Sequence, residues 1–147
     1  MGADLNDPFV KKLGLRPGQR VCLLPAPGDP LSAQAAAGLH AACPPGVSVD
    51  TRLEPGRYDQ IFFWPNSLEG LDELFAELQG WITPQGAVWA VIPKQQYALP
   101  RGITFTWEAV QAAGLQTDLV DNKIASLNEQ DYATRFVIRK DRREQYA

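Results

Sequence analysis

The chain has 147 residues, of which 45% are hydrophobic and 21% charged, and its net charge is -3. These values predict one globular domain over 1–147, which ends in a solvated basic tail at 141–147. The negative charge argues against nucleic-acid and membrane partners, and no apolar run approaches the ~20 residues of a membrane span. Residues 1–7 lack the features of a signal peptide, which favours the cytoplasm.

Cysteine and histidine are too scarce to form a metal site. Cys22 lies in an apolar run, Cys43 follows an alanine-rich segment, and His40 is the single histidine. Structural zinc needs about four such ligands. We therefore expect two small, buried thiols, no metal, and neither Ser-His-Asp nor Cys-His catalysis.

The first half of the chain alternates helix and strand signals. A continuous apolar run predicts a strand covered on both faces. Asp29 is placed to cap a helix whose first residue is Pro30 and whose many alanines favour helix. The expected elements are a helix over 8–14, a strand over 21–24, a helix over 30–43 and a half-exposed strand over 47–51.

The middle of the chain carries the strongest strand signal, at 61–64. Asn66 and Glu69 have the spacing of a capping box at the start of the next helix, and Gly80 ends that helix. A turn at 83–86 precedes a second buried strand over 87–92. The apolar face expected for the helix consists of Leu68, Leu71, Leu74, Phe75 and Leu78.

The last third begins with a looser segment over 95–102. Thr106 is expected to cap a short helix that Gly114 closes. Two strands follow, over 119–127 and 132–139, and the loop between them is too short for a parallel crossover, so they must be antiparallel. The whole pattern predicts an α/β three-layer sandwich with a mostly parallel sheet, a C-terminal antiparallel hairpin and its ligand edge at the carboxyl ends of the strands.

Three stretches resemble the class I S-adenosylmethionine (SAM)-dependent methyltransferases. "LGLRPGQRVCLLPAPGD" is similar to their first strand and loop, "YDQIFFWPNSLEGLDELFAELQGWITPQGAVWAVIPK" to their central strand, helix, turn and next strand, and "TWEAVQAAGL" to the helix before their final hairpin. Pro93-Lys94 and the segment 128–136 also resemble a bacterial family of short domains that look like truncated, degenerate versions of these enzymes. The resemblance implies a Rossmann-like fold over roughly 10–140.

The first loop departs from the methyltransferase pattern. Leu23 stands at the position of an acidic residue, Pro25 and Pro27 stand at two glycine positions, and Asp29 holds the third unless a one-residue shift gives it to Gly28. Proline fixes φ, adds a ring and removes an N–H donor, which opposes each property of a glycine loop. The short spacing before "YDQIFFWP" also indicates a missing strand–helix unit. We therefore expect a degenerate SAM-binding loop.

Several residues are candidates for a ligand site, each with a structural alternative. The segment 63–66 resembles the Asn/Asp-Pro-Pro-aromatic motif of amino-methyltransferases, but Asn66 also suits a helix cap. Lys94 is either a carboxylate or phosphate ligand or a solvated strand end, and Trp64 is either core or pocket mouth. The ligand-binding candidates are Gly28, Asp29, Trp64, Asn66 and Lys94.

Other polar and aromatic residues are expected to be structural. Asp50 and Glu54 follow the second strand, where methyltransferases hold the ribose, but a surface role is favoured. Arg135 is expected to pair with Asp121 or Glu129. Trp89 and Trp107 are expected in the core, and no residue is assigned a catalytic role.

Two functions follow, and a third possibility stays open. The favoured one is a non-catalytic methyltransferase-like domain that binds a protein partner or a small ligand, without a cofactor. The alternative is an active SAM-dependent small-molecule methyltransferase with an atypical loop. The third possibility is a homodimer formed through the hairpin or an exposed helix face.

Overall fold

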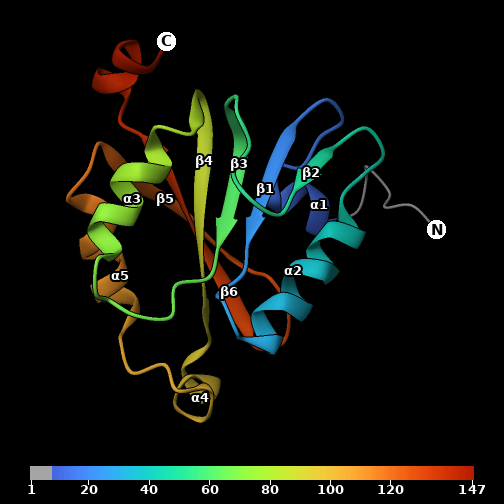
Figure 1. The fold of residues 1–147 in the computed structure, drawn as a ribbon, viewed down its shortest axis with the longest axis vertical. Coiled ribbons are helices and arrows are strands. Elements are labelled where there is room, and N and C mark those ends of the chain that lie inside the picture. Colours follow the sequence, from blue (N-terminus) through green and yellow to red (C-terminus); the bar gives the residue numbers. More distant parts are fainter. Residues whose placement is uncertain (1–7) are drawn as a thin grey trace.

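The computed structural model describes residues 8–147, which form one six-stranded sheet between helices (Figure 1). The strand order is β2-β1-β3-β4-β6-β5. The first four strands are parallel, and β6 pairs antiparallel with both β4 and β5. The strands are β1 (Arg20–Leu24), β2 (Ser48–Asp50), β3 (Tyr58–Phe63), β4 (Ile82–Pro93), β5 (Leu119–Ser126) and β6 (Asp131–Ile138). The predicted α/β class is confirmed.

Helices cover both faces of the sheet and so build the three layers. Two apolar clusters result: α1 and α2 pack on the face that carries Trp89, and α3 and α5 pack on the face that carries Phe136. No helix within residues 8–147 is long and apolar enough to cross a bilayer. The helical elements are α1 (Pro8–Leu13), α2 (Pro30–Ala42), α3 (Leu71–Gln79), α4 (Gln95–Ala98), η1 (Leu99–Arg101), α5 (Trp107–Leu115) and η2 (Lys140–Tyr146).

A short loop over 51–57 joins β2 to β3 without a helix or a strand of its own. Leu53 of this loop packs against the apolar cluster that contains Cys22 and Tyr58. The Tyr58 hydroxyl also accepts the Glu54 N–H at 2.9 Å. The loop therefore covers part of the sheet face next to β1, which agrees with the short spacing seen in the sequence.

The expected capping box at the start of α3 is wrong. The N-cap residue is Gly70, with φ of 70°, and the helix begins one residue later. Glu69 instead donates its backbone N–H to Ser67 Oγ at 3.1 Å, and Asn66 is exposed. Leu68 is 43% exposed and so does not belong to the buried face. The hydrogen bond to Ser67 forms a local turn, so residues 66–69 are not helical. The helix starts after Gly70 because glycine can adopt the left-handed conformation found at this N-cap.

The expected turn at 83–86 is also wrong, because these residues belong to β4. Ile82 pairs with Tyr58, and pairing resumes five residues later in β4 but only two residues later in β3, where Gln60 is opposite Ala87. The extra residues form a bulge. A Cβ at Gly86 would lie 3.0 Å from the Asp59 carbonyl, so glycine is required by this close approach.

Gly114 does not end α5, which continues to Leu115. A Cβ at this position would overlap the Phe136 ring, so Gly114 allows α5 to pack closely on β6. Residues 140–146 form η2, and most of this C-terminal tail is exposed, as expected. Tyr146 packs against the core and donates its hydroxyl to Asp118 Oδ2 at 2.6 Å.

Candidate functional site

A cleft of about 420 Å³ opens at the carboxyl ends of β1 and β3. Its walls are the loop after β1, the segment that leads from β3 into α3, and Thr51 after β2. This is the edge at which parallel α/β sheets commonly bind ligands. Most of the lining is apolar, and Glu69 is its single charged residue; the lining includes Pro25, Pro27, Thr51, Trp64, Asn66 and Leu74.

The loop after β1 uses most of its amide hydrogens internally. Its two prolines have none. The Ala26 N–H donates to Ser32 Oγ at 3.0 Å, and the Asp29 N–H donates to the Ala26 carbonyl at 3.2 Å. Within 25–29, Gly28 alone retains an amide without a partner among the described residues, and its φ of 72° fits a tight turn. The loop is thus closed on itself through a buried serine.

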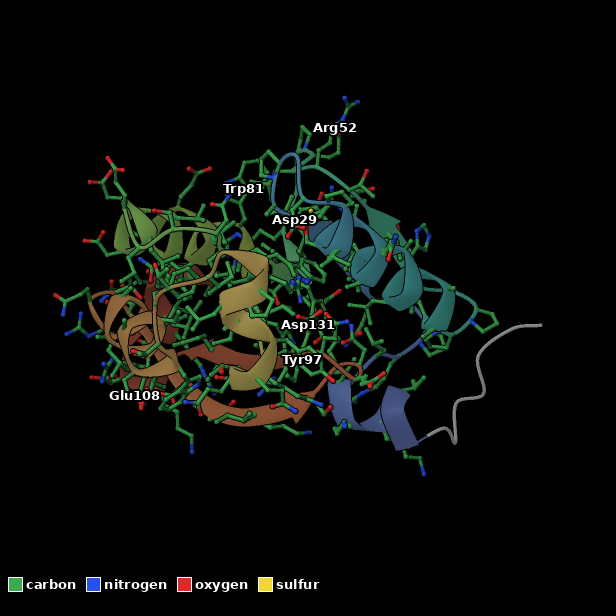
Figure 2. All side chains as sticks on the ribbon, turned by 90° about the horizontal axis from the view of Figure 1, so that it is seen from below. Asp29, Arg52, Trp81, Tyr97, Glu108 and Asp131 are labelled. Atoms are coloured by element: carbon green, nitrogen blue, oxygen red, sulfur yellow. The ribbon has the colours of Figure 1, made fainter. Side chains whose placement is uncertain are left out.

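Asp29 caps α2, as predicted. One carboxylate oxygen accepts the Leu31 N–H at 3.1 Å. The other oxygen lies 3.9 Å from the Arg101 guanidinium. Asp29 does not line the cleft. Its carboxylate faces another part of the carboxyl edge, where Figure 2 shows it in the same region as Asp131.

The partner of these two carboxylates is Arg101, which comes from η1. Its side chain is 9% exposed and lies 2.6 Å from Asp131 Oδ1; the Asp131 side chain is 3% exposed. Asp131 Oδ2 also accepts Nδ2 of Asn128 at 3.2 Å. Arg101 Nε is buried and has no hydrogen-bond partner among residues 8–147. This ion cluster fixes the α4–η1 segment across the end of the sheet.

Sequence reasoning missed Arg101. It is the one basic residue of the segment expected to be loose, between Pro100 and Gly102. The signal that could have found it is a basic residue within the segment that follows the fourth strand, on the edge where Asp29 caps a helix and Asp131 begins a strand.

Lys94 also lies outside the cleft. Its Nζ donates to the Asn128 carbonyl at 2.9 Å, and its backbone N–H donates to the Gln130 carbonyl at 2.6 Å. Lys94 is half-buried and holds the turn between β5 and β6. Lys94 therefore does not line the cleft. It is also not a freely solvated residue at the end of a strand, which was the second interpretation of its position.

Trp64 and Asn66 are the two predicted candidates that line the cleft. Trp64 is 5% exposed, which places most of its ring in the core. Its indole N–H is buried and has no acceptor among the described residues. Asn66 is exposed at the cleft rim. Gly28 lies in the loop that borders the cleft, so the structure brings together part of the predicted set.

Asp50 is occupied by structural partners at the end of β2. Its Oδ2 accepts the Tyr58 hydroxyl at 2.6 Å and lies 3.3 Å from the Arg20 guanidinium. Burial, followed by this bond to Asp50, raises the pKa of Tyr58 to about 12. Glu54 pairs with the exposed Arg52 at 2.5 Å. Both residues thus bind other parts of the chain, although Asp50 is only partly exposed and so does not have the surface role that was favoured for it.

The two cysteines and the histidine lie in different surroundings. Burial raises the pKa of the Cys22 thiol to about 11 and raises that of the half-buried Cys43, so both thiols are poor nucleophiles near neutral pH. His40 is exposed on α2. Within 8–147, no cluster of three His, Cys, Asp or Glu side chains is arranged to hold a metal ion.

The predicted core tryptophans differ in burial. Trp89 is fully buried, stacks on Phe62 and donates its indole N–H to Gln60 at 2.8 Å. Trp107 is half-buried and donates to Thr134 Oγ1 at 2.7 Å. Both have hydrogen-bond partners within the fold, so neither is a candidate ligand contact.

No family model and no curated protein matches this sequence. Solved structures do match. A TehB-like SAM-dependent methyltransferase from Corynebacterium glutamicum has a TM-score of 0.57 and 8% identity, and the match covers 89% of this chain and 85% of that one. The N-methyltransferase NodS from Bradyrhizobium japonicum, in complex with S-adenosyl-L-homocysteine, has a TM-score of 0.55 and 12% identity, with coverage of 92% and 91%.

A third match is the CcbJ methyltransferase from Streptomyces caelestis, with a TM-score of 0.54, 11% identity and coverage of 88% and 86%. At these identities the likeness concerns the fold. The chain therefore has the Rossmann-like α/β fold of SAM-dependent methyltransferases, with a sheet that is parallel except at its C-terminal antiparallel pair.

Proposed function

We propose that this chain is a non-catalytic methyltransferase-like domain that binds a small, mainly apolar ligand in the cleft between the β1 loop and α3. The observation that carries the proposal is a contrast within the cleft. The cleft at the carboxyl edge has a volume of about 420 Å³, which lies within the range of small-molecule sites. The polar groups that would orient a nucleoside are bonded to the chain itself.

The residues present do not fit SAM well. SAM carries a charged amino-acid moiety and two ribose hydroxyls, each of which needs a polar partner. The loop retains one amide, that of Gly28, and the carboxylate of Asp50 is held by Tyr58 and Arg20. At roughly 1–3 kcal/mol for each unmet polar group, several such losses remove most of the affinity expected of a cofactor site.

The lining indicates the kind of ligand. Leu24, Phe63 and Leu74 supply apolar surface, and Asn66 and Glu69 supply polar groups on one side. A flat, largely apolar molecule with one hydrogen-bond donor matches this arrangement. A protein partner that inserts an aromatic side chain presents the same chemistry.

The alternative is an active SAM-dependent methyltransferase with an atypical loop. Its support is the fold shared with enzymes such as NodS, whose structure holds S-adenosyl-L-homocysteine. Titration calorimetry with SAM and S-adenosyl-L-homocysteine separates the two functions. We expect no heat of binding from either compound, and micromolar binding of either one would reverse the proposal.

A matched pair of variants tests the cleft itself. Indole serves as the probe, and its binding is followed by ligand-observed NMR. Thr51→Trp places a large ring in the cleft, whereas Arg52→Trp changes the neighbouring side chain, which is 85% exposed and points away from the molecule (Figure 2). We expect Thr51→Trp to abolish indole binding and Arg52→Trp to preserve it. Equal binding by both variants would place the probe elsewhere and contradict the proposal.

A further inference from the structure

A second pocket, of about 430 Å³, lies at the opposite, amino edge of the sheet. It is bounded by α1 and the turn into β1, by the beginnings of β3 and β4, and by two residues of the C-terminal hairpin. Its one acidic side chain is Asp59, which accepts the Arg20 backbone N–H at 2.8 Å. The basic residues that line it are Lys11, Lys12, Arg16, Lys123 and Arg135.

The charge of this pocket is not balanced by the part of the chain that the structure describes. Neither Arg16 nor Lys123 nor Arg135 forms an ion pair within residues 8–147. Lys123 donates to the Lys12 carbonyl, a neutral acceptor. Three of the basic side chains around this cavity thus have no carboxylate partner within residues 8–147.

Arg135 is the most informative of these residues. The predicted partners were wrong: the Arg135 guanidinium reaches Asn122 Oδ1, at 3.4 Å, whereas Asp121 accepts from Gln111 at 3.1 Å. Arg135 is half-buried, and burial together with the nearby Arg143 lowers its pKa. A partly desolvated guanidinium with one weak neutral acceptor is costly to maintain.

The strand register adds a second unfavourable term. Lys123 of β5 lies directly opposite Arg135 of β6, next to the irregularity at Asn122. Like charges that are directly opposite across strands destabilise the sheet. An anion bound between them would remove both costs, since it would neutralise the pair and satisfy the guanidinium.

We propose that this pocket binds a small phosphorylated molecule. Phosphate oxygens match the bidentate donors of Arg135 and the ammonium of Lys123. The side chains of Thr83 and Gln85 also line the pocket and have no hydrogen-bond partner within residues 8–147, so they can bind a neutral part of the ligand. The volume suits a molecule of nucleotide size. This pocket lies apart from the cleft of the proposed function, so the two can be tested separately.

The probe is inorganic pyrophosphate, titrated calorimetrically into the full chain at low salt. We expect one saturable site whose affinity falls as sodium chloride is raised, because the contacts are ionic. Arg135→Gln is expected to weaken binding by about tenfold or more, the usual effect of losing a hydrogen bond between charged groups. Arg135→Lys is expected to retain part of the affinity, since it keeps the charge but loses the bidentate geometry.

Lys94→Gln is the matched control. It removes the same charge at the opposite edge of the sheet, from a residue that does not line the pocket. The proposal predicts unchanged pyrophosphate affinity for this variant. An equal loss in Lys94→Gln and Arg135→Gln, or no saturable binding by the unaltered chain at low salt, would overturn it. So would tight binding of a single-stranded oligonucleotide that pyrophosphate fails to displace, because the surface would then serve a nucleic acid.

Discussion

Arg101 and Arg135 lie at opposite edges of one sheet, and their surroundings differ sharply. Arg101, at the carboxyl edge, lies between Asp29 and Asp131 and is 9% exposed. Arg135, at the amino edge, has Lys123 opposite it and a single weak amide acceptor. The charge of Arg101 is neutralised by these two carboxylates of the chain, so its role is structural. The charge of Arg135 has no carboxylate partner among the described residues, and this is the observation from which the phosphate site is proposed.

The largest effect is expected from Arg101→Met. This change leaves Asp131 buried without its cation, a situation that typically costs about 3–5 kcal/mol. Urea denaturation measures the free energy of unfolding. Arg52→Met, which removes an exposed ion pair, is the control and should cost less than about 1 kcal/mol. The double variant Arg101→Met/Asp131→Asn should recover part of the loss, because no buried charge remains. A loss as small as the control's would mean that Arg101 is not a structural clamp.

A smaller effect is expected from Tyr58→Phe, which breaks the hydrogen bond to Asp50 at the end of β2. The unsatisfied partner costs roughly 1–3 kcal/mol of unfolding free energy. The effect depends on pH. The pKa of Tyr58 rises from 10.0 to about 12 in the folded chain, so its contribution is complete below pH 10 and is lost as the pH rises toward 12.

Denaturation curves recorded across this alkaline range check the assignment. Tyr146, whose pKa is also raised to about 12 by burial and by its bond to Asp118, should account for part of the alkaline loss. The double variant Tyr58→Phe/Tyr146→Phe should therefore show a flatter stability profile than either single variant. If the profile of Tyr58→Phe matched that of the unaltered chain, Asp50 would be available for another role.

The smallest effect, and of opposite sign, is expected from Arg135→Gln without ligand. Removing one of two like charges that face each other across β5 and β6 should stabilise the fold by about 0.2–1 kcal/mol. The same urea titration detects this gain, and adding pyrophosphate should reverse the order of stability of the two proteins. Destabilisation by Arg135→Gln would show that this arginine is structural, like Arg101, and would remove the contrast between the two edges.

Some features of the site could be predicted from neighbouring residues alone. Asp29 precedes a proline at the first helical position, and it caps α2 in the structure. The loop prolines predict missing N–H donors, a property that no tertiary contact changes. The prediction that Asn66 caps α3 was wrong, because the helix starts after Gly70, whose backbone adopts the left-handed conformation. The spacing between Asn66 and Glu69 contains no information about the backbone of Gly70.

The sequence by itself determined the class of fold. Buried strands appear as continuous apolar runs, and a four-residue loop cannot connect parallel strands, so short segments of sequence contain this information. The tertiary structure decided which charges meet. Arg101 reaches Asp131 across 30 residues, and Lys123 faces Arg135 because of strand register. Such pairs depend on how distant segments pack, because a side chain's partners are set by the space around it and not by its neighbours along the chain.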